Sequence, residues 1–143
     1  MKAKKYLSEI HLQRNRCKIL EEQAEQLRCQ IEGVKGITYD KDKVQTSVTN
    51  AVEDQLAKLI DIERQYTKAL AEFNTMFLHR EKQIAQMGKP EYIRILQLRY
   101  LETDNGQRLS LEKIAVLTHW SYDHVRHLHG EALAAFGRKY LGQ

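Results

Sequence analysis

The chain has 143 residues, of which 42% are hydrophobic, and a formal net charge of +4. This length corresponds to about one domain, and no apolar run is long enough to span a bilayer, so a membrane protein is not expected. The basic residues Lys2, Lys4 and Lys5 are followed by an amphipathic segment with Glu9 and Arg14 rather than by an apolar core, which argues against a signal peptide. The expected location is therefore the cytoplasm.

The two cysteines, Cys17 and Cys29, stand on one predicted helix. Their spacing corresponds to roughly 18 Å of helical rise, which is too far for a disulfide. We expect two reduced thiols in a reducing compartment.

The N-terminal half carries two seams of apolar residues at alternating steps of three and four, the spacing of a coiled coil. A connector over about 33–46, with two glycines and a run of alternating charges, separates the seams, and Thr46 or Ser47 is expected to start the second helix. The oligomerisation residues predicted from the seams are Ile10, Leu20, Leu27, Ile31, Leu56, Leu59, Tyr66, Leu70, Phe73 and Phe77.

Glu63 and Arg80 are charged residues inside the second seam. The sequence leaves three interpretations open for each of them: the side chain extends its charge to solvent, it pairs across the interface, or it marks loosened packing at a frayed edge. A single helix cannot bury such a seam alone, so the helices pack as an antiparallel hairpin, on a second protomer, or both. Further apolar residues off the seam favour more than one partner for the second helix. They are Ile60, Ile62, Met76 and Leu78.

The motif Gly88-Lys89-Pro90 ends the second helix and opens the next one, because proline is tolerated in a first helical turn. It predicts a boundary between a coiled-coil oligomerisation region, 1–88, and a helix-turn-helix domain, 89–143. Residues 91–101 are expected to form a scaffold helix, and 102–109 form a polar, turn-prone loop.

The segment 110–133 has the spacing of a helix-turn-helix. Ser110 and Ser121 each precede a helical run, where a hydroxyl can cap the first turn, and a short turn separates the two runs. His119 occupies a turn position where glycine is common because φ is positive, a conformation that histidine tolerates better than most residues. The predicted core of the unit is Ile114, Ala115, Trp120, Val125 and Leu128.

The second helix of this unit, from Tyr122 onward, is the one expected to lie in the major groove of double-stranded DNA. An ordinary pair of packed helices would show the same caps and spacing, and it remains the alternative. The predicted DNA-binding residues are Tyr122, Asp123, His124, Arg126 and His127.

The last third of the chain resembles region 4 of bacterial sigma-70 factors, the domain that reads the upstream element of promoters. The resemblance is carried by Ile-Leu-Gln-Leu-Arg-Tyr-Leu at 95–101, Ser-Leu-Glu-Lys-Ile-Ala at 110–115, Ser-x-x-x-Val-Arg at 121–126 and Ala-Leu at 132–133. The layout of the whole chain is similar to phage-encoded regulators of late-gene transcription of the RinA and ArpU type. The resemblance implies a transcription regulator that acts in a bacterial host cell.

Position by position, the resemblance implies that Tyr122, Asp123 and His127 contact bases and that Arg126 contacts the DNA backbone. Sigma factors usually have Arg, Glu and Gln at the first three positions, so a different target sequence is implied. Tyrosine lacks the paired donors with which arginine reads guanine, but its ring can lie against a thymine methyl. Asp123 either accepts from a cytosine amino group or serves only as a helix-start carboxylate. Arg126 suits a phosphate.

Four histidines crowd this segment, at 119, 124, 127 and 129. We interpret them as an exposed, DNA-facing surface whose positive charge increases below neutral pH, so DNA affinity is expected to rise as pH falls. His124 and His127 share a helix face at a spacing a metal could use, but no recognisable ligand set completes the pair. No metal site and no cofactor are expected.

The sequence contains no glycine-rich phosphate loop and no nucleophile elbow, so we predict no catalytic residues and no enzyme activity. The expected fold is all-α, with an N-terminal coiled coil or long helical hairpin followed by a small helix-turn-helix domain similar to sigma region 4. The expected function is a sequence-specific DNA-binding regulator that activates phage late genes. It is expected to form a homo-oligomer, with a dimer as the first hypothesis, and to contact host RNA polymerase. The alternative is a sigma-like adaptor that binds polymerase or another protein with little DNA specificity. A purely structural coiled coil is the third reading.

Overall fold

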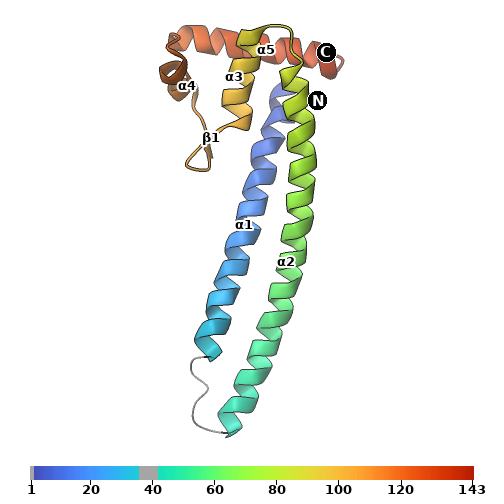
Figure 1. Ribbon diagram of the computed structural model, residues 1–143, viewed down its shortest axis with the longest axis vertical. Helices are drawn as coiled ribbons and strands as arrows, with labels where there is room; N and C mark the ends of the chain where they lie inside the picture. The colour runs from blue at the N-terminus through green and yellow to red at the C-terminus, as the bar shows by residue number, and fades with distance from the viewer. Residues whose placement is uncertain (1, 36–41) are drawn as a thin grey trace. The chain divides into compact units, whose positions relative to one another are not determined.

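The computed structural model describes residues 2–35 and 42–143 of an all-α protein, as the sequence predicts (Figure 1). In the described ranges, no helix has the length and apolar character needed to cross a membrane. The elements are α1 (Ala3–Lys35), α2 (Asp42–Ala85), α3 (Pro90–Leu96), the π-helical turn η1 (Gln97–Leu101), strands β1 (Thr103–Asp104) and β2 (Gln107–Arg108), α4 (Leu111–Thr118) and α5 (Tyr122–Tyr140).

Contacts between residues divide the chain into two compact units. The first unit joins Met1–Gln13 to Phe73–Gln143, and the second is Arg14–Glu72. The domain boundary predicted from the sequence lies at residue 88 instead. The divisions differ because the ends of both long helices pack into the core of the first unit, where Leu7 and Ile84 are fully buried.

The predicted connector between the long helices is too long at both ends. Helix α1 continues through Gly33 to Lys35, and α2 begins at Asp42, before the expected start at Thr46 or Ser47. A helical glycine costs only about 1 kcal/mol relative to alanine, which a long helix absorbs. Residues 36–41 of the predicted connector lie outside the described residues.

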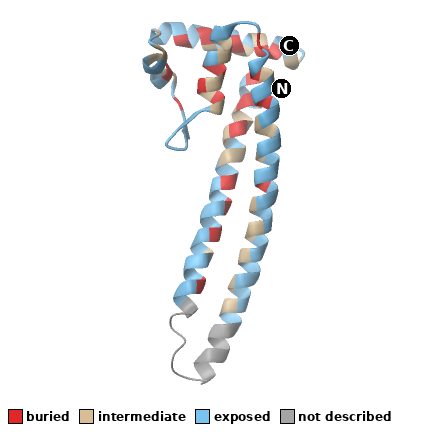
Figure 2. Ribbon diagram, in the orientation of Figure 1, coloured by how far each residue is buried: buried red, intermediate tan, exposed pale blue. Residues whose placement is uncertain are grey.

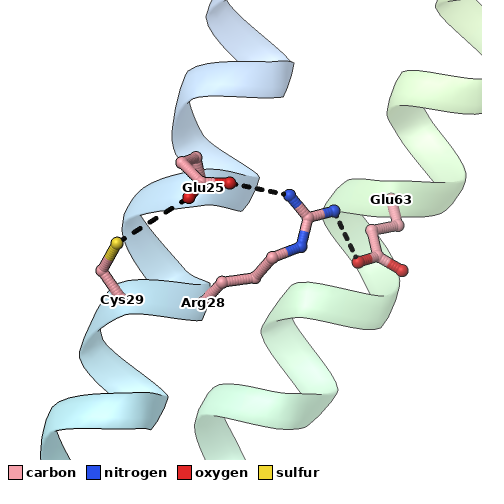
Figure 3. Close-up of polar contacts among 4 residues, drawn as sticks. All are labelled: Glu25, Arg28, Cys29 and Glu63. Carbon is pink, nitrogen blue, oxygen red and sulfur yellow. Dashed lines mark hydrogen bonds and ion pairs between the residues drawn. The ribbon is translucent and has the colours of Figure 1, made fainter.

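In the second unit, Arg28 on α1 lies between two carboxylates (Figure 3). Its guanidinium donates to Glu25 Oε2 at 3.2 Å, one turn earlier on α1, and to Glu63 Oε1 at 3.0 Å on α2. Both hydrogen bonds raise the pKa of Arg28, and the bond to Glu63 has the larger effect. Closer to the start of α1, Arg16 Nη1 lies 3.7 Å from Glu72 Oε2. From Arg16 to Arg28 the residue numbers increase along α1, whereas those of their partners on α2 decrease from 72 to 63. The two helices are therefore antiparallel in this unit, and Glu63 pairs across their interface.

In the first unit, Arg80 of α2 is 9% exposed and also pairs across the interface. Its Nη2 lies 2.9 Å from Glu9 Oε2, and its Nη1 donates to the Tyr6 carbonyl oxygen at 2.8 Å. The guanidinium also lies over the Tyr6 ring, 3.9 Å from its centroid. Tyr6 in turn donates its hydroxyl to Gln83 Oε1 at 2.8 Å. Of the three readings left open by the sequence, pairing is the one observed for both charged seam residues.

The seam on α2 departs from the predicted one at two positions. Leu56 is 38% exposed and Leu70 is 36% exposed, and beside Leu70 it is Ala69 that is fully buried. Of the other predicted oligomerisation residues, Ile10, Leu20 and Ile31 are buried, and Leu27, Leu59, Tyr66, Phe73 and Phe77 are half-buried.

The core of the first unit gathers side chains from all the described helices, and Figure 2 marks buried residues on α3 and along α5. The expected scaffold helix over 91–101 is present as α3 followed by η1, in which the Glu102 amide donates to the Gln97 carbonyl oxygen at 3.0 Å. The wider π turn shifts the helix register. The buried residues of the core are Ala3, Leu7, Ile84, Met87, Ile95, Leu96, Leu98, Tyr100, Leu109, Ile114, Val125, Leu128, Ala132 and Phe136.

Replacing Arg80 with alanine is expected to lower the free energy of unfolding by about 2 kcal/mol, because Glu9 and the Tyr6 carbonyl lose a charged donor in a buried setting. Urea denaturation of the full chain measures the change. Arg94→Ala, which removes an exposed arginine from α3, is the matched control and should cost less than about 0.5 kcal/mol. Equal losses in the two variants would contradict the role given to Arg80.

Candidate nucleic-acid interface

Both helices of the predicted helix-turn-helix begin at the expected serine caps. The Ser110 hydroxyl accepts a hydrogen bond from the Lys113 amide at 3.1 Å, and the Ser121 hydroxyl accepts one from the His124 amide, also at 3.1 Å. Each cap satisfies one of the amides that a first helical turn leaves unpaired. The start of α5 is therefore fixed at Tyr122.

The turn between α4 and α5 passes through His119 in the left-handed region, at φ 61° and ψ 20°. This confirms the conformation predicted for that position. Thr118 stabilises the same turn, since its hydroxyl donates to the Ile114 carbonyl oxygen at 2.7 Å and accepts from the Trp120 amide at 3.4 Å. The Thr118 hydroxyl thus connects the residues before and after His119 and holds the turn at this strained position.

The apolar residues predicted for the unit lie between α4, α5 and the scaffold helix. Ile114 and Val125 are fully buried, and Leu128 is 6% exposed. Ala115 and Trp120 are half-buried and pack against the same cluster. Burial of these faces leaves the opposite side of α5 in solvent.

The first two turns of α5 expose all five predicted DNA-binding side chains, and four of them have no ring contact with the turn before the helix. Tyr122 is 42% exposed, and Asp123, Arg126 and His127 are also exposed. Arg126 Nη2 lies 3.9 Å from Asp123 Oδ1, and the two side chains are 63% and 82% exposed. An exposed pair of this kind contributes little to stability, so Arg126 is available to an anion.

His124, the fifth predicted residue, is exposed but its ring contacts Trp120 edge-on, with the ring centroids 5.5 Å apart. His124 therefore links the exposed face of α5 to the turn that precedes the helix. In the described part of the chain, no three His, Cys, Asp or Glu side chains gather in a way that could hold a metal ion.

His129 is a correction to the predicted histidine surface, because it points inward. Its Nε2 lies 2.8 Å from the hydroxyl of buried Tyr100, and the two rings stack with centroids 5.7 Å apart. Burial first, and then the nearby positive charges of Arg99, Lys4 and Arg108, lower the pKa of His129 to about 4. His129 therefore does not belong to the exposed histidine surface, on which His119, His124 and His127 lie.

Tyr100 and its neighbours form a polar centre that the sequence analysis does not identify. Burial raises the pKa of Tyr100 to about 12, so its hydroxyl keeps its proton and can donate it to a neutral His129 ring. Beside it, Arg99 donates to the Leu109 carbonyl oxygen, and His11 Nε2 lies 3.1 Å from the Arg99 carbonyl oxygen. These bonds connect the π turn to α5, to the residue that follows β2, and to α1.

The loop before α4 is a short hairpin rather than an irregular turn. Thr103 pairs with Arg108 and Asp104 with Gln107, and Asn105 and Gly106 at its tip have φ values of 52° and 79°. Both tip residues at positive φ are typical of the tight turns that close two-stranded hairpins. An open cleft beside the start of α4 is lined by the hairpin together with Ser110 and Lys113.

Comparisons with protein-family models, with curated proteins and with solved structures each returned no match.

The left-handed turn predicts a contrast between two substitutions of His119. His119→Val should lower the free energy of unfolding by about 1–2 kcal/mol, because a β-branched side chain is strained at φ 61°. His119→Gly should stay within about 0.5 kcal/mol of the wild type, since relief of strain offsets the greater freedom of the unfolded chain. Thermal and urea unfolding compare the two, and a valine variant as stable as the glycine variant would contradict the assignment.

Buried His129 predicts a loss of stability in acid. Its pKa is about 4 in the folded chain against an ordinary 6.5, so between these values the unfolded chain binds a proton that the folded chain does not. The free energy of unfolding should therefore fall as pH decreases from about 6.5 to 4. His129→Gln keeps a partner for Tyr100 but does not titrate, and it should reduce this slope. The exposed control His79→Gln should leave the slope unchanged, and equal slopes in all three proteins would exclude this role for His129.

Proposed function

We propose that this protein is a sequence-specific DNA-binding transcription regulator that reads double-stranded DNA with α5. The observation that carries the proposal is the exposed face of the first two turns of α5, whose start and direction are set by two serine caps and the left-handed turn. In a helix-turn-helix, this is the part of the second helix that reaches base edges in the major groove.

Each exposed side chain on this face suits a part of DNA. Tyr122 presents an aromatic ring to a thymine methyl, and Asp123 presents an acceptor to a cytosine amino group. His127 can donate to or accept from a base edge, and Arg126 can grip a phosphate, which sets register without reading sequence. A site read by tyrosine, aspartate and histidine differs from that of sigma factors with arginine, glutamate and glutamine.

The biological setting comes from the resemblance to sigma region 4 and to phage late-gene regulators. We assign the protein to activation of phage late promoters in the cytoplasm of a bacterial host cell, with RNA polymerase as a further partner. A dimer with two-fold symmetry would place two copies of α5 on half-sites related by an inverted repeat.

A second function, a sigma-like adaptor that binds RNA polymerase or another protein, is favoured by the exposed apolar side chains of α4. Val116 is 69% exposed and Leu117 is 47% exposed, and the partly exposed ring of Tyr122 follows them in the chain. Exposed apolar side chains close together often mark protein contacts.

Selection of bound sequences from a random DNA pool tests the proposal and separates the two functions. The full-length protein should enrich a defined motif at near-physiological salt, and Arg126→Ala should bind all sequences about tenfold more weakly, with a salt dependence reduced by about one phosphate contact. His127→Ala should instead change the preference at one position by about 1–3 kcal/mol. Arg138→Ala, which removes an exposed arginine from the last turn of α5, is the matched control and should behave as the wild type.

Salt-sensitive binding without an enriched motif would exclude the sequence-specific function and favour the adaptor. Equal effects of Arg126→Ala and Arg138→Ala would show that the first turns of α5 do not contact DNA.

A further inference from the structure

Helix α2 has an exposed apolar face within the unit Arg14–Glu72. Ile60 is 51% exposed and Leu56 is 38% exposed, whereas Ala69, on the seam towards α1, is fully buried. Side chains four residues apart lie on the same helix face, so Leu56 and Ile60 are neighbours. They form an apolar contact surface that the antiparallel pairing with α1 leaves uncovered.

Opposite charges flank this surface. Glu53 stands three residues before Leu56, Arg64 stands four after Ile60, and both are exposed. Glu53 and Arg64 are about 16 Å apart along the helix axis, too far to pair with each other in one chain. We call Glu53, Leu56, Ala57, Ile60 and Arg64 the outer α2 patch.

We propose that the outer α2 patch binds a second copy of this chain, with the two α2 helices antiparallel. A two-fold axis between Leu56 and Ile60 sets Leu56 of each copy against Ile60 of the other. The same axis brings Glu53 of each copy next to Arg64 of the other, and the small side chain of Ala57 allows the helices to approach.

The charge pattern favours this occupant and this direction. A parallel pair would place Glu53 against Glu53 and Arg64 against Arg64, which is repulsive at both ends, whereas the antiparallel pair is attractive at both ends. A surface complementary to itself is what a two-fold interface requires. The contact involves few apolar side chains, so the dimer should be weak and concentration-dependent.

The proposal deepens the oligomeric part of the proposed function and does not depend on DNA reading. It also separates the roles of the seam residues, because Ala69 and the buried residues of α1 serve the contact within one chain.

Sedimentation velocity of the full-length protein over a range of concentrations tests the patch. The wild type should shift from monomer to dimer, and Ile60→Lys should raise the dissociation constant at least about tenfold, because it buries a charge in the contact. Ile19→Lys is the matched control, since Ile19 is 54% exposed on α1 of the same unit, and it should dimerise as the wild type does. Circular dichroism should show the same helix content in all three.

A charge exchange tests the antiparallel direction. Glu53→Arg and Arg64→Glu should each weaken the dimer several-fold, and the double variant should recover most of the wild-type association. A wild type that is monomeric at all concentrations, equal effects of Ile60→Lys and Ile19→Lys, or a double variant weaker than either single one would each overturn the proposal.

DNA selection on the same samples keeps this result apart from the proposed function. A monomer that enriches an unrepeated motif would overturn the dimer and leave DNA reading in place, whereas a dimer without an enriched motif would do the reverse.

Discussion

The hydrogen bond between Tyr100 and His129 joins the scaffold helix to α5, and the direction of the proposed recognition surface depends on it. Tyr100 is fully buried, so its hydroxyl needs a partner, and His129 supplies one from the second half of α5. The serine cap at the start of α5 sets where the helix begins, while this bond, together with burial of Val125 and Leu128, holds the helix in one rotation on its support. Exposure of Arg126 and burial of Val125 on adjacent positions both follow from that rotation.

Features encoded by a few neighbouring residues could be predicted from the sequence, and features set by tertiary packing could not. Ser110, Ser121 and His119 act within their own turns, so their roles follow from local chemistry. The inward position of His129 depends on a hydroxyl 29 residues earlier in the chain, at Tyr100. Because histidine is suited both to an exposed surface and to a buried hydrogen bond, its residue type alone favours neither.

The same limit applies to the long helices. A repeat of apolar residues predicts that α2 has a seam, but whether Ala69 or Leu70 lies on it depends on how the helix is rotated at that one turn. The π turn shifts the register of its own helix, and nothing in its sequence predicts it. Arg80 and Glu63 show the same limit, since the sequence leaves pairing as one of several alternatives, and only the structure identifies their partners, Glu9 and Arg28.

The first unit is built from both ends of the chain, and this has a consequence for modularity. Leu7 of α1 and Ile84 of α2 lie in the same core as the helices that carry the recognition surface. A fragment beginning at Gly88 would lack these side chains and would leave their apolar neighbours uncovered. Recombination that moves this unit between proteins would therefore have to transfer two separated segments of the chain together. Because those segments are the ends of α1 and α2, the evolution of the long helices is tied to that of the unit that contains α4 and α5.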